Sequence, residues 1–223
     1  MVLIQKEGSP ITDNEALHDR IFAVPGFVED DGAHREFADG DHGLKLDWGV
    51  IIPGMPEHDD AAAAAAEHIL GYDIPPNYIL SVANGTTNIT FSVIESMREQ
   101  DPSNRTSILV THKWPTREVA FTERTQYVLE DDNIDFLLIL EDVATRGSTT
   151  AKLATRALSL GVRNVRVLNF VQRRAQLERL DAASVEHASL IHDYSLPTYT
   201  PEECKTLTEG YCKNGMQLIP HGS

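Results

Sequence analysis

One segment, residues 136–150, constrains the fold of this chain more than any other. It reads Phe-Leu-Leu-Ile-Leu-Glu-Asp-Val-Ala-Thr-Arg-Gly-Ser-Thr-Thr. The five apolar residues at its start predict a buried strand, and the carboxylates of Glu141 and Asp142 stand where that strand is expected to end. A short loop containing Gly147 follows, and Ala151 favours a helix after the loop. This order of strand, loop and helix predicts one unit of an α/β fold.

The loop has the properties of a phosphate-binding site. Gly147 lacks a Cβ, so the chain can turn sharply there and approach a ligand closely. Hydroxyl donors are supplied by Thr145, Ser148, Thr149 and Thr150. The following helix would add the free N–H groups and positive dipole end of its N-terminus. The adjacent carboxylates would repel a phosphate unless they bind ribose hydroxyls or a divalent cation such as Mg²⁺. The segment therefore predicts a sugar-phosphate site, and an ordinary strand–loop–helix connection with an acidic strand end is the alternative.

Residues 141–150 resemble the phosphoribosyl pyrophosphate (PRPP) signature of type I phosphoribosyltransferases, including its apolar lead-in. Arg146 stands where a small or hydroxyl residue is usual, and Ser148 stands where glycine is common. The resemblance implies that Glu141 and Asp142 hold the ribose hydroxyls, bind Mg²⁺ and act in catalysis. It also implies that PRPP contacts continue along the loop, at Ala144, Thr145, Arg146, Gly147, Ser148 and Thr149.

Apolar and helix-prone runs alternate along most of the chain. Strands are expected at residues 78–83, 107–111, 136–140, 164–171 and 185–191, and helices at 61–70, 90–98 and 152–160. In the helix at 90–98, we expect Phe91, Ile94 and Met97 on one side. Residues 116–129 favour a hairpin or a mobile flap. The alternation predicts a mainly parallel sheet whose ligands bind beyond the carboxyl ends of the strands.

Together with the resemblance, this pattern implies the type I phosphoribosyltransferase fold: an α/β domain with a mainly parallel twisted sheet flanked by helices and a small N-terminal hood. We expect a single domain over residues 1–223. Within it, hood and base-side elements are expected at 1–60, the α/β core at 61–195 and a C-terminal tail at 196–223.

Two further segments are similar to the PRPP-binding parts of orotate phosphoribosyltransferases. Asn84, Gly85 and Thr86 follow a predicted strand and resemble the loop that binds the diphosphate of PRPP. Lys113 matches one residue of an Arg-Lys pair that contacts PRPP. The resemblance implies that Lys113 neutralises the charge of the leaving diphosphate and is catalytic.

Base recognition is implied at two other places. Residues 39–48, Asp-Gly-Asp-His-Gly-Leu-Lys-Leu-Asp-Trp, resemble the hood segment of the orotate enzymes at Gly40, His42 and Asp47, and they bring Lys45 near the base. An exposed acidic turn is the alternative for this segment. Arg173 ends a strand where the orotate enzymes have an arginine that binds the orotate carboxylate, a planar group that a guanidinium fork matches.

One segment departs from the orotate enzymes. Where they have a mobile loop with a Lys-x-His-Gly core, residues 114–120 read Trp-Pro-Thr-Arg-Glu-Val-Ala. Arg117 and Arg124 are the available replacements for the missing charge, and no motif selects either. In the orotate enzymes this loop comes from the neighbouring subunit, so a homodimer is expected.

The implied reaction transfers ribose 5-phosphate from PRPP to a small anionic base. Orotate is the expected base, with orotidine 5′-monophosphate and diphosphate as products. The alternatives are a different base, a catalytically weak PRPP-binding regulator, and a binding module with a coincidental motif.

Composition limits the partners and the compartment. A net charge of −15 argues against nucleic acid or an anionic membrane as partner. No apolar run has the length of a membrane span, and the N-terminal residues lack the features of a signal peptide, so a cytoplasmic protein is expected. Cys204 and Cys212 are expected as reduced thiols, although their spacing permits a disulfide. A zinc site there would need two further ligands, for which His221 is the nearby candidate in the sequence.

Overall fold

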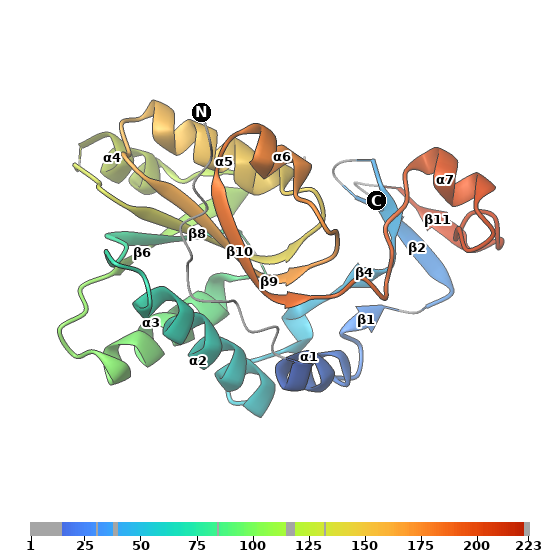
Figure 1. Cartoon of the computed structure of the whole chain (residues 1–223), viewed down its shortest axis with the longest axis horizontal. Coiled ribbons are helices and arrows are strands. Elements are labelled where there is room, and N and C mark those ends of the chain that lie inside the picture. The colour runs from blue at the N-terminus through green and yellow to red at the C-terminus, as the bar shows by residue number, and fades with distance from the viewer. Residues whose placement is uncertain are drawn as a thin grey trace.

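A six-stranded, mainly parallel sheet forms the centre of the protein (Figure 1). The computed structural model describes residues 15–29, 31–37, 40–83, 85–114, 119–131 and 133–220. The strands of the sheet are β10 (Glu186–His192), β9 (Val165–Gln172), β8 (Leu137–Ala144), β5 (Tyr78–Ser81), β6 (Ser107–Lys113) and β7 (Val119–Phe121), in this spatial order. The first five are parallel, and β7 pairs antiparallel with β6. The predicted mainly parallel sheet is confirmed.

Helices cover both faces of this sheet. One face packs against α1 (Glu15–Phe22), α2 (Pro56–Leu70) and α3 (Thr87–Gln100), and the other against α4 (Glu123–Asp131), α5 (Ser148–Ser159) and α6 (Glu178–Ala182). Strand β8 shows why two cores form. Leu138 and Leu140 join the first core, whereas Leu137 and Ile139 join the second, because successive side chains of a strand point to opposite faces. A continuous apolar run thus makes a strand that is buried on both sides.

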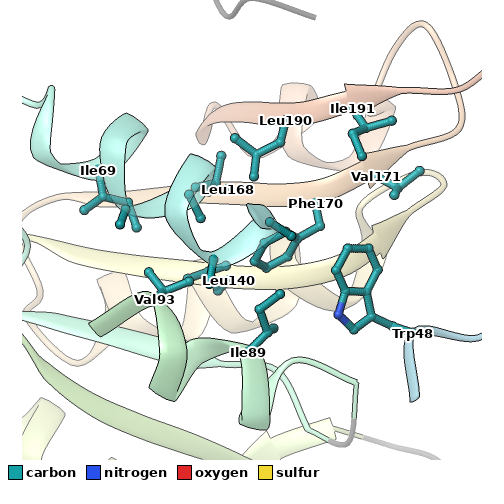
Figure 2. Packing of buried hydrophobic residues seen from close by; sticks show 14 of the residues in the cluster. Trp48, Ile69, Ile89, Val93, Leu140, Leu168, Phe170, Val171, Leu190 and Ile191 are labelled. Carbon is teal, nitrogen blue, oxygen red and sulfur yellow. The ribbon is translucent and has the colours of Figure 1, made fainter. Parts of the chain in front are cut away.

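The first core is closed by aromatic and small side chains. Figure 2 shows Leu140, Leu168 and Phe170 of the sheet beside Ile89 of α3, with Trp48 at one end. Trp48 belongs to a short 3-10 helix, η1 (Trp48–Val50). Four alanines of α2 are also buried, namely Ala61, Ala62, Ala65 and Ala66. The alanine run is therefore a packed helix, as expected.

Two small sheets and one helix form the hood. Strand β1 (Val28–Glu29) pairs with β4 (Lys45–Leu46), and β2 (Ala33–Glu36) lies between β3 (His42–Gly43) and β11 (Gln217–Ile219). Helix α7 (Pro201–Thr206) precedes β11 in the chain and lies beside these strands (Figure 1). Because β11 comes from the C-terminal region and pairs with β2, segments that are distant in the sequence form the hood together.

Among the expected boundaries that differ from the structure, two shape the site. Strand β8 does not end before Glu141 but continues to Ala144, because β9 still pairs with it there. Helix α5 begins at Ser148 rather than at Lys152, so the hydroxyl residues of the loop form its first turn.

Two other expectations were wrong. Phe91 is 53% exposed and does not share the buried side of α3 with Ile94 and Met97. Spacing of three residues drifts from the 3.6-residue period, and the buried face runs through Val93 and Met97 instead. Residues 123–131 form helix α4, and the hairpin is limited to the pairing of β6 with β7.

No helix within the described residue ranges is long and apolar enough to cross a membrane.

Candidate active site

A cavity of about 610 Å³ opens between the carboxyl end of β8 and the hood. Its wall contains many of the residues predicted for the site: Lys45, Lys113, Glu141, Asp142, Ala144, Thr145, Gly147, Ser148, Thr149 and Arg173. A cavity of similar size beside Pro75 and Asn104 lies at the opposite, amino end of β5. Because ligands of parallel α/β sheets bind at the carboxyl ends of strands, we assign the site to the cavity at β8.

The loop between β8 and α5 brings a helix N-terminus to this cavity. Gly147 is the N-cap of α5 and has a left-handed φ of 74°, which glycine adopts without strain. A Cβ at Gly147 would lie 2.8 Å from Cγ of Leu180, so the packing against α6 also requires glycine. Ser148, Thr149 and Thr150 form the first helical turn and line the cavity. The N–H groups of such a turn have no partners inside the helix, and together with the helix dipole they suit a bound phosphate.

The acidic pair lies where β8 extends beyond β5. The pairing of β5 with β8 ends at Ser81 and Leu140, whereas β9 accompanies β8 as far as Ala144. Glu141 and Asp142 therefore lie in a part of β8 that pairs with a neighbouring strand on one edge only, and both residues line the cavity.

Burial makes both carboxyl groups of the acidic pair harder to ionise. Burial raises the pKa of Glu141 well above its ordinary value, and the charge of Asp142 adds to this effect. Burial also raises the pKa of Asp142, although a hydrogen bond of 2.8 Å from the Val143 N–H acts in the opposite direction. The ammonium of Lys113 favours the charged form of both, without reversing either shift. A pair of this kind is stabilised in its ionised form by a bound cation.

The loop after β5 touches the acidic pair. A Cβ at Gly85 would lie 1.7 Å from Oδ2 of Asp142, so the backbone of Gly85 packs directly against that carboxylate. The predicted diphosphate loop and the acidic pair therefore meet. The hydroxyl of Thr86 is buried and donates to the carbonyl of Val82 at 2.5 Å, so it does not face the cavity. Asn84 lies outside the described residues.

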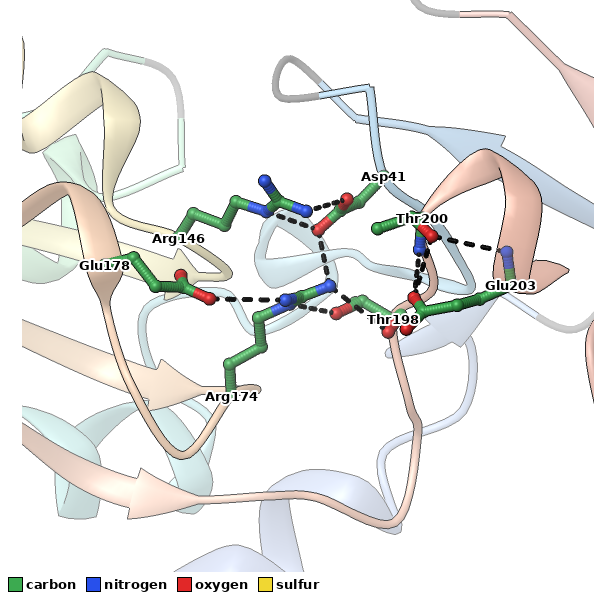
Figure 3. Close-up of polar contacts among 7 residues, drawn as sticks. All are labelled: Asp41, Arg146, Arg174, Glu178, Thr198, Thr200 and Glu203. Carbon is green, nitrogen blue, oxygen red and sulfur yellow. Dashed lines mark hydrogen bonds and ion pairs between the residues drawn. The ribbon is translucent and has the colours of Figure 1, made fainter.

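Arg146 turns from the loop toward the hood instead of into the cavity (Figure 3). Its Nε and Nη2 donate to the two oxygens of Asp41 at 2.8 and 2.5 Å. Arg174, which follows β9, places its Nη2 2.7 Å from Oδ2 of Asp41. Asp41 is only 1% exposed, and two guanidinium groups compensate its buried charge. The side chain of Arg146, predicted to contact PRPP, is thus engaged with the hood.

Arg173 is a buried cation at the cavity wall. It is 3% exposed, and its Nη1 and Nη2 donate to the backbone carbonyls of Leu44 and Leu196 at 2.5 and 2.7 Å. Its Nε has no hydrogen-bond partner within the described chain. The guanidinium lies 5.5 Å from the ring centre of Phe37. Burial lowers the pKa of Arg173 to about 10, the direction expected where the cationic form is poorly compensated.

Lys45 also lines the cavity, but its ammonium is paired with hood carboxylates. Nζ lies 2.5 Å from Oε1 of Glu29 and 3.4 Å from Oδ2 of Asp47. Burial acts against the charged form, yet these two carboxylates raise the pKa of Lys45 overall. A ligand that binds Lys45 would have to compete with them.

The sequence reasoning missed several hood residues on the cavity wall. Among them, Arg35 donates from Nη2 to Glu29 and Asp31 at 2.9 Å each, while its buried Nη1 has no partner among the described residues. Phe37 lines the cavity beside it, and Ile219 approaches from β11. No local pattern marks these residues, because they reach the cavity only when the C-terminal strand β11 pairs with β2.

The cysteines have unexpected neighbours. Cys204 and Cys212 carry free thiols, and their sulfur atoms lie beside ring nitrogens of His34 and His42. His221, the predicted additional ligand, lies outside the described residues. His34 and His42 are eight residues apart on paired strands, and this spacing was the sequence signal that could have pointed to them as neighbours of the cysteines.

The sheet order, the hood and the loop at the end of β8 define the fold of type I phosphoribosyltransferases, and solved structures share it. The chain matches orotate phosphoribosyltransferase from Mycobacterium tuberculosis in complex with inorganic phosphate with a TM-score of 0.56 and 13% identity, over 81% of this chain and 95% of that chain. It matches orotate phosphoribosyltransferase from Aeropyrum pernix with a TM-score of 0.53 and 18% identity, over 81% of this chain and 93% of that chain. It also matches adenine phosphoribosyltransferase from Trypanosoma brucei, in complex with AMP, pyrophosphate and ribose-5-phosphate. The TM-score is 0.50 and the identity 11%, over 67% of this chain and 70% of that chain. No protein-family model and no curated protein matches the chain.

Proposed function

We propose that this chain is a phosphoribosyltransferase that transfers ribose 5-phosphate from PRPP to a small anionic base, with orotate as the first candidate. One observation supports this most: a helix N-terminus, an acidic pair and a buried arginine line the same cavity at the carboxyl edge of the sheet. These are a phosphate site, a site for ribose hydroxyls or a cation, and an anion site. The likeness in fold to orotate phosphoribosyltransferases over 81% of this chain agrees with the proposal.

The PRPP part of the proposal assigns the 5′-phosphate to the first turn of α5. Thr145, Ser148 and Thr149 would add hydroxyl donors to the backbone N–H groups of that turn. Glu141 and Asp142 would hold the ribose hydroxyls and, through oxygen atoms that Mg²⁺ prefers, the metal ion. When bound, Mg²⁺ would neutralise the diphosphate charge.

The base part of the proposal depends on Arg173. Its guanidinium is buried, and its Nε lacks a partner within the described chain. A carboxylate on the base would compensate this charge, and orotate carries one. Phe37 lies close enough to Arg173 to contact the ring of the same base.

Catalysis in this proposal is positioning and charge stabilisation, without a protein nucleophile. The ribose carbon acquires positive charge as the diphosphate leaves, and Glu141 and Asp142 face that charge from β8. Lys113, at the end of β6, would stabilise the negative charge on the diphosphate. Gly85 allows the diphosphate loop to lie against Asp142.

The test is to incubate the purified protein with orotate, PRPP and Mg²⁺ and to follow the loss of orotate absorbance. Turnover that is lost in Asp142→Asn and kept in Asp135→Asn, a matched change at an exposed carboxylate, supports the proposal. Absence of turnover combined with absence of PRPP binding by calorimetry would refute it.

A second candidate is a PRPP-binding regulator with weak catalysis. Strand β6 ends at Lys113 and pairs antiparallel with β7, which begins at Val119. The segment between them is short for a flap that covers a diphosphate, and it lacks the Lys-x-His-Gly core of the orotate enzymes. PRPP binding without turnover on orotate, adenine or hypoxanthine would favour this candidate. Adenine belongs among the bases tested, because the chain also shares its fold with an adenine phosphoribosyltransferase.

The homodimer and the cytoplasmic location are part of the same proposal. Light scattering of the purified protein tests the dimer, and fractionation of cells tests the location.

A further inference from the structure

Four side chains of metal-ligating type meet in the hood, outside the cavity described above. They are His34 and His42 of the β2–β3 hairpin, and Cys204 and Cys212 from α7 and the turn after it. One atom of each, His34 Nε2, His42 Nδ1 and the two Sγ atoms, lies within 4.8 Å of all the others. His34 and Cys204 are fully buried, His42 is 3% exposed, and Cys212 is partly buried.

The separations fit one tetrahedral ion. Sγ of Cys212 lies 3.2 Å from Nε2 of His34 and 3.4 Å from Nδ1 of His42. Sγ of Cys204 lies 3.8 Å from Nε2 of His34. A tetrahedral zinc ion with ordinary bond lengths would set its sulfur and nitrogen ligands about 3.6 Å apart. The four ligand atoms therefore surround a space of the right size without a change of backbone.

The fold holds these residues in place by contacts of its own. A Cβ at Gly210 would lie 2.3 Å from the carbonyl oxygen of Cys204, so the absence of a side chain lets the turn fold back. That turn brings the backbone N–H of Cys212 to 3.1 Å from Sγ of Cys204. N–H groups directed at sulfur are suited to a thiolate, which is the metal-binding form of cysteine. On the opposite side, His42 and Tyr199 exchange backbone hydrogen bonds of 2.7 and 2.9 Å.

We propose that His34, His42, Cys204 and Cys212 bind one structural Zn²⁺ ion. Two thiolates and two imidazoles form a donor set that favours zinc over magnesium or calcium. Four protein ligands leave no position for a substrate, which is the arrangement of a structural site. Binding deprotonates both thiols and releases those protons to solvent.

The ion would join the N-terminal hairpin to the C-terminal turn. The hairpin segment borders the cavity through Phe37, and β11, which follows the turn, borders it through Ile219. Zinc would thus fix the hood over the site without taking part in the reaction. This inference does not depend on the proposed transferase activity, because its measurements are of metal content and coordination.

The test begins with protein produced in zinc-containing medium, purified under reducing conditions and analysed for metals by mass spectrometry. We expect about one zinc per chain, in agreement with a single four-ligand site. Replacement by Co²⁺ should give the intense visible bands of a tetrahedral ion and a thiolate charge-transfer band. Cys212→Ser and His42→Gln should lose most of the zinc, whereas the control His187→Gln, at a histidine of β10 that is paired with Asp181, should keep it.

Wild-type protein makes the test independent of how well the variants fold. Folded, metal-free wild-type protein that takes up no Zn²⁺ or Co²⁺ with reduced thiols would overturn the inference. A Cys204–Cys212 disulfide in protein isolated from a reducing cytoplasm without bound metal would overturn it equally. Cobalt bands typical of octahedral oxygen ligands would show that the metal binds elsewhere and would also refute it.

Discussion

The contact of Asp41 with Arg146 and Arg174 should be a main source of stability for the junction of hood and sheet. We consider the substitution Asp41→Asn, which keeps the shape of the side chain and removes its charge. Both oxygens of Asp41 accept from guanidinium groups, in three contacts between 2.5 and 2.8 Å. The variant leaves two arginines facing an amide in a buried position.

The expected loss follows from the burial of the partners. Removing one member of a fully buried ion pair costs about 3–5 kcal/mol. Arg146 and Arg174 are 22% and 21% exposed, so water solvates part of the charge that remains. Arg174 also keeps a hydrogen bond of 2.8 Å to Thr198. We therefore expect a loss of about 2–3 kcal/mol in the free energy of unfolding. For a chain of this length that corresponds to a fall in Tm of about 4–12 °C.

Urea unfolding followed by circular dichroism measures this loss. The matched control is Asp135→Asn, because Asp135 pairs with Arg163 at a surface where the two side chains are 58% and 60% exposed. An exposed pair contributes about 0.2–1 kcal/mol. Added salt should reduce the small effect of the control and leave the effect of Asp41→Asn largely unchanged, because buried pairs are screened less.

A double-mutant cycle separates the pair from other effects of the substitution. Asp41→Asn combined with Arg146→Gln should show a coupling of about 1–3 kcal/mol, since the two residues are in direct contact. Equal losses for Asp41→Asn and Asp135→Asn, or a coupling near zero, would contradict the reasoning.

Three further predictions concern the cavity. Gly85→Ala should abolish PRPP binding in calorimetry with little change in Tm, because the new Cβ at position 85 would displace the carboxylate of Asp142. The control is Gly71→Ala, at a helix end with a φ of −74°, and this variant should bind PRPP normally. Glu141→Gln should raise Tm relative to wild type at about pH 8 and not at about pH 4. The raised pKa of the Glu141 carboxyl favours the folded state at low pH, and that contribution is lost as pH rises. An equal difference in Tm between variant and wild type at both pH values would be inconsistent with the raised pKa. Arg173→Lys should weaken orotate binding at least tenfold, about 1.4 kcal/mol, because one ammonium cannot both keep the contacts to the carbonyls of Leu44 and Leu196 and supply the free donor that Nε offers. PRPP affinity should stay within about twofold, and a parallel loss of both affinities would contradict a base-specific role.

The core sheet could be predicted from the sequence because its strands are buried on both faces. Leu137 to Leu140 are all apolar, and such runs mark a parallel strand without knowledge of its neighbours. The start of α5 was placed late because Ser148 and Thr149 have modest helix propensity, and the N-cap conformation of Gly147 decides the boundary instead. Helix α4 was missed because its sequence contains β-prone residues, while the burial of Thr125 and Leu129, four positions apart, fixes it as a helix.

The candidate site was predictable where it follows one strand end and its loop. Glu141, Asp142 and Gly147 are close in sequence, so local motifs locate them together. The hood residues were not predictable in this way, because each depends on pairing between distant segments. His34 and Cys212, for example, are 178 positions apart in the chain and 3.2 Å apart in space. Such contacts arise only when β11 and the turn before it return to the N-terminal hairpin.

Arg146, the unusual residue in the segment that resembles the PRPP signature, has a structural explanation that is compatible with the proposed phosphate site. A helix N-terminus binds phosphate through backbone N–H groups, so no particular side chain is required at position 146. Arg146 uses its side chain to hold Asp41 of the hood. Positions 41 and 146 are therefore joined by one direct contact. In the proposed function, the short connection between β6 and β7 is the departure that bears on catalysis, because that connection would have to cover the diphosphate.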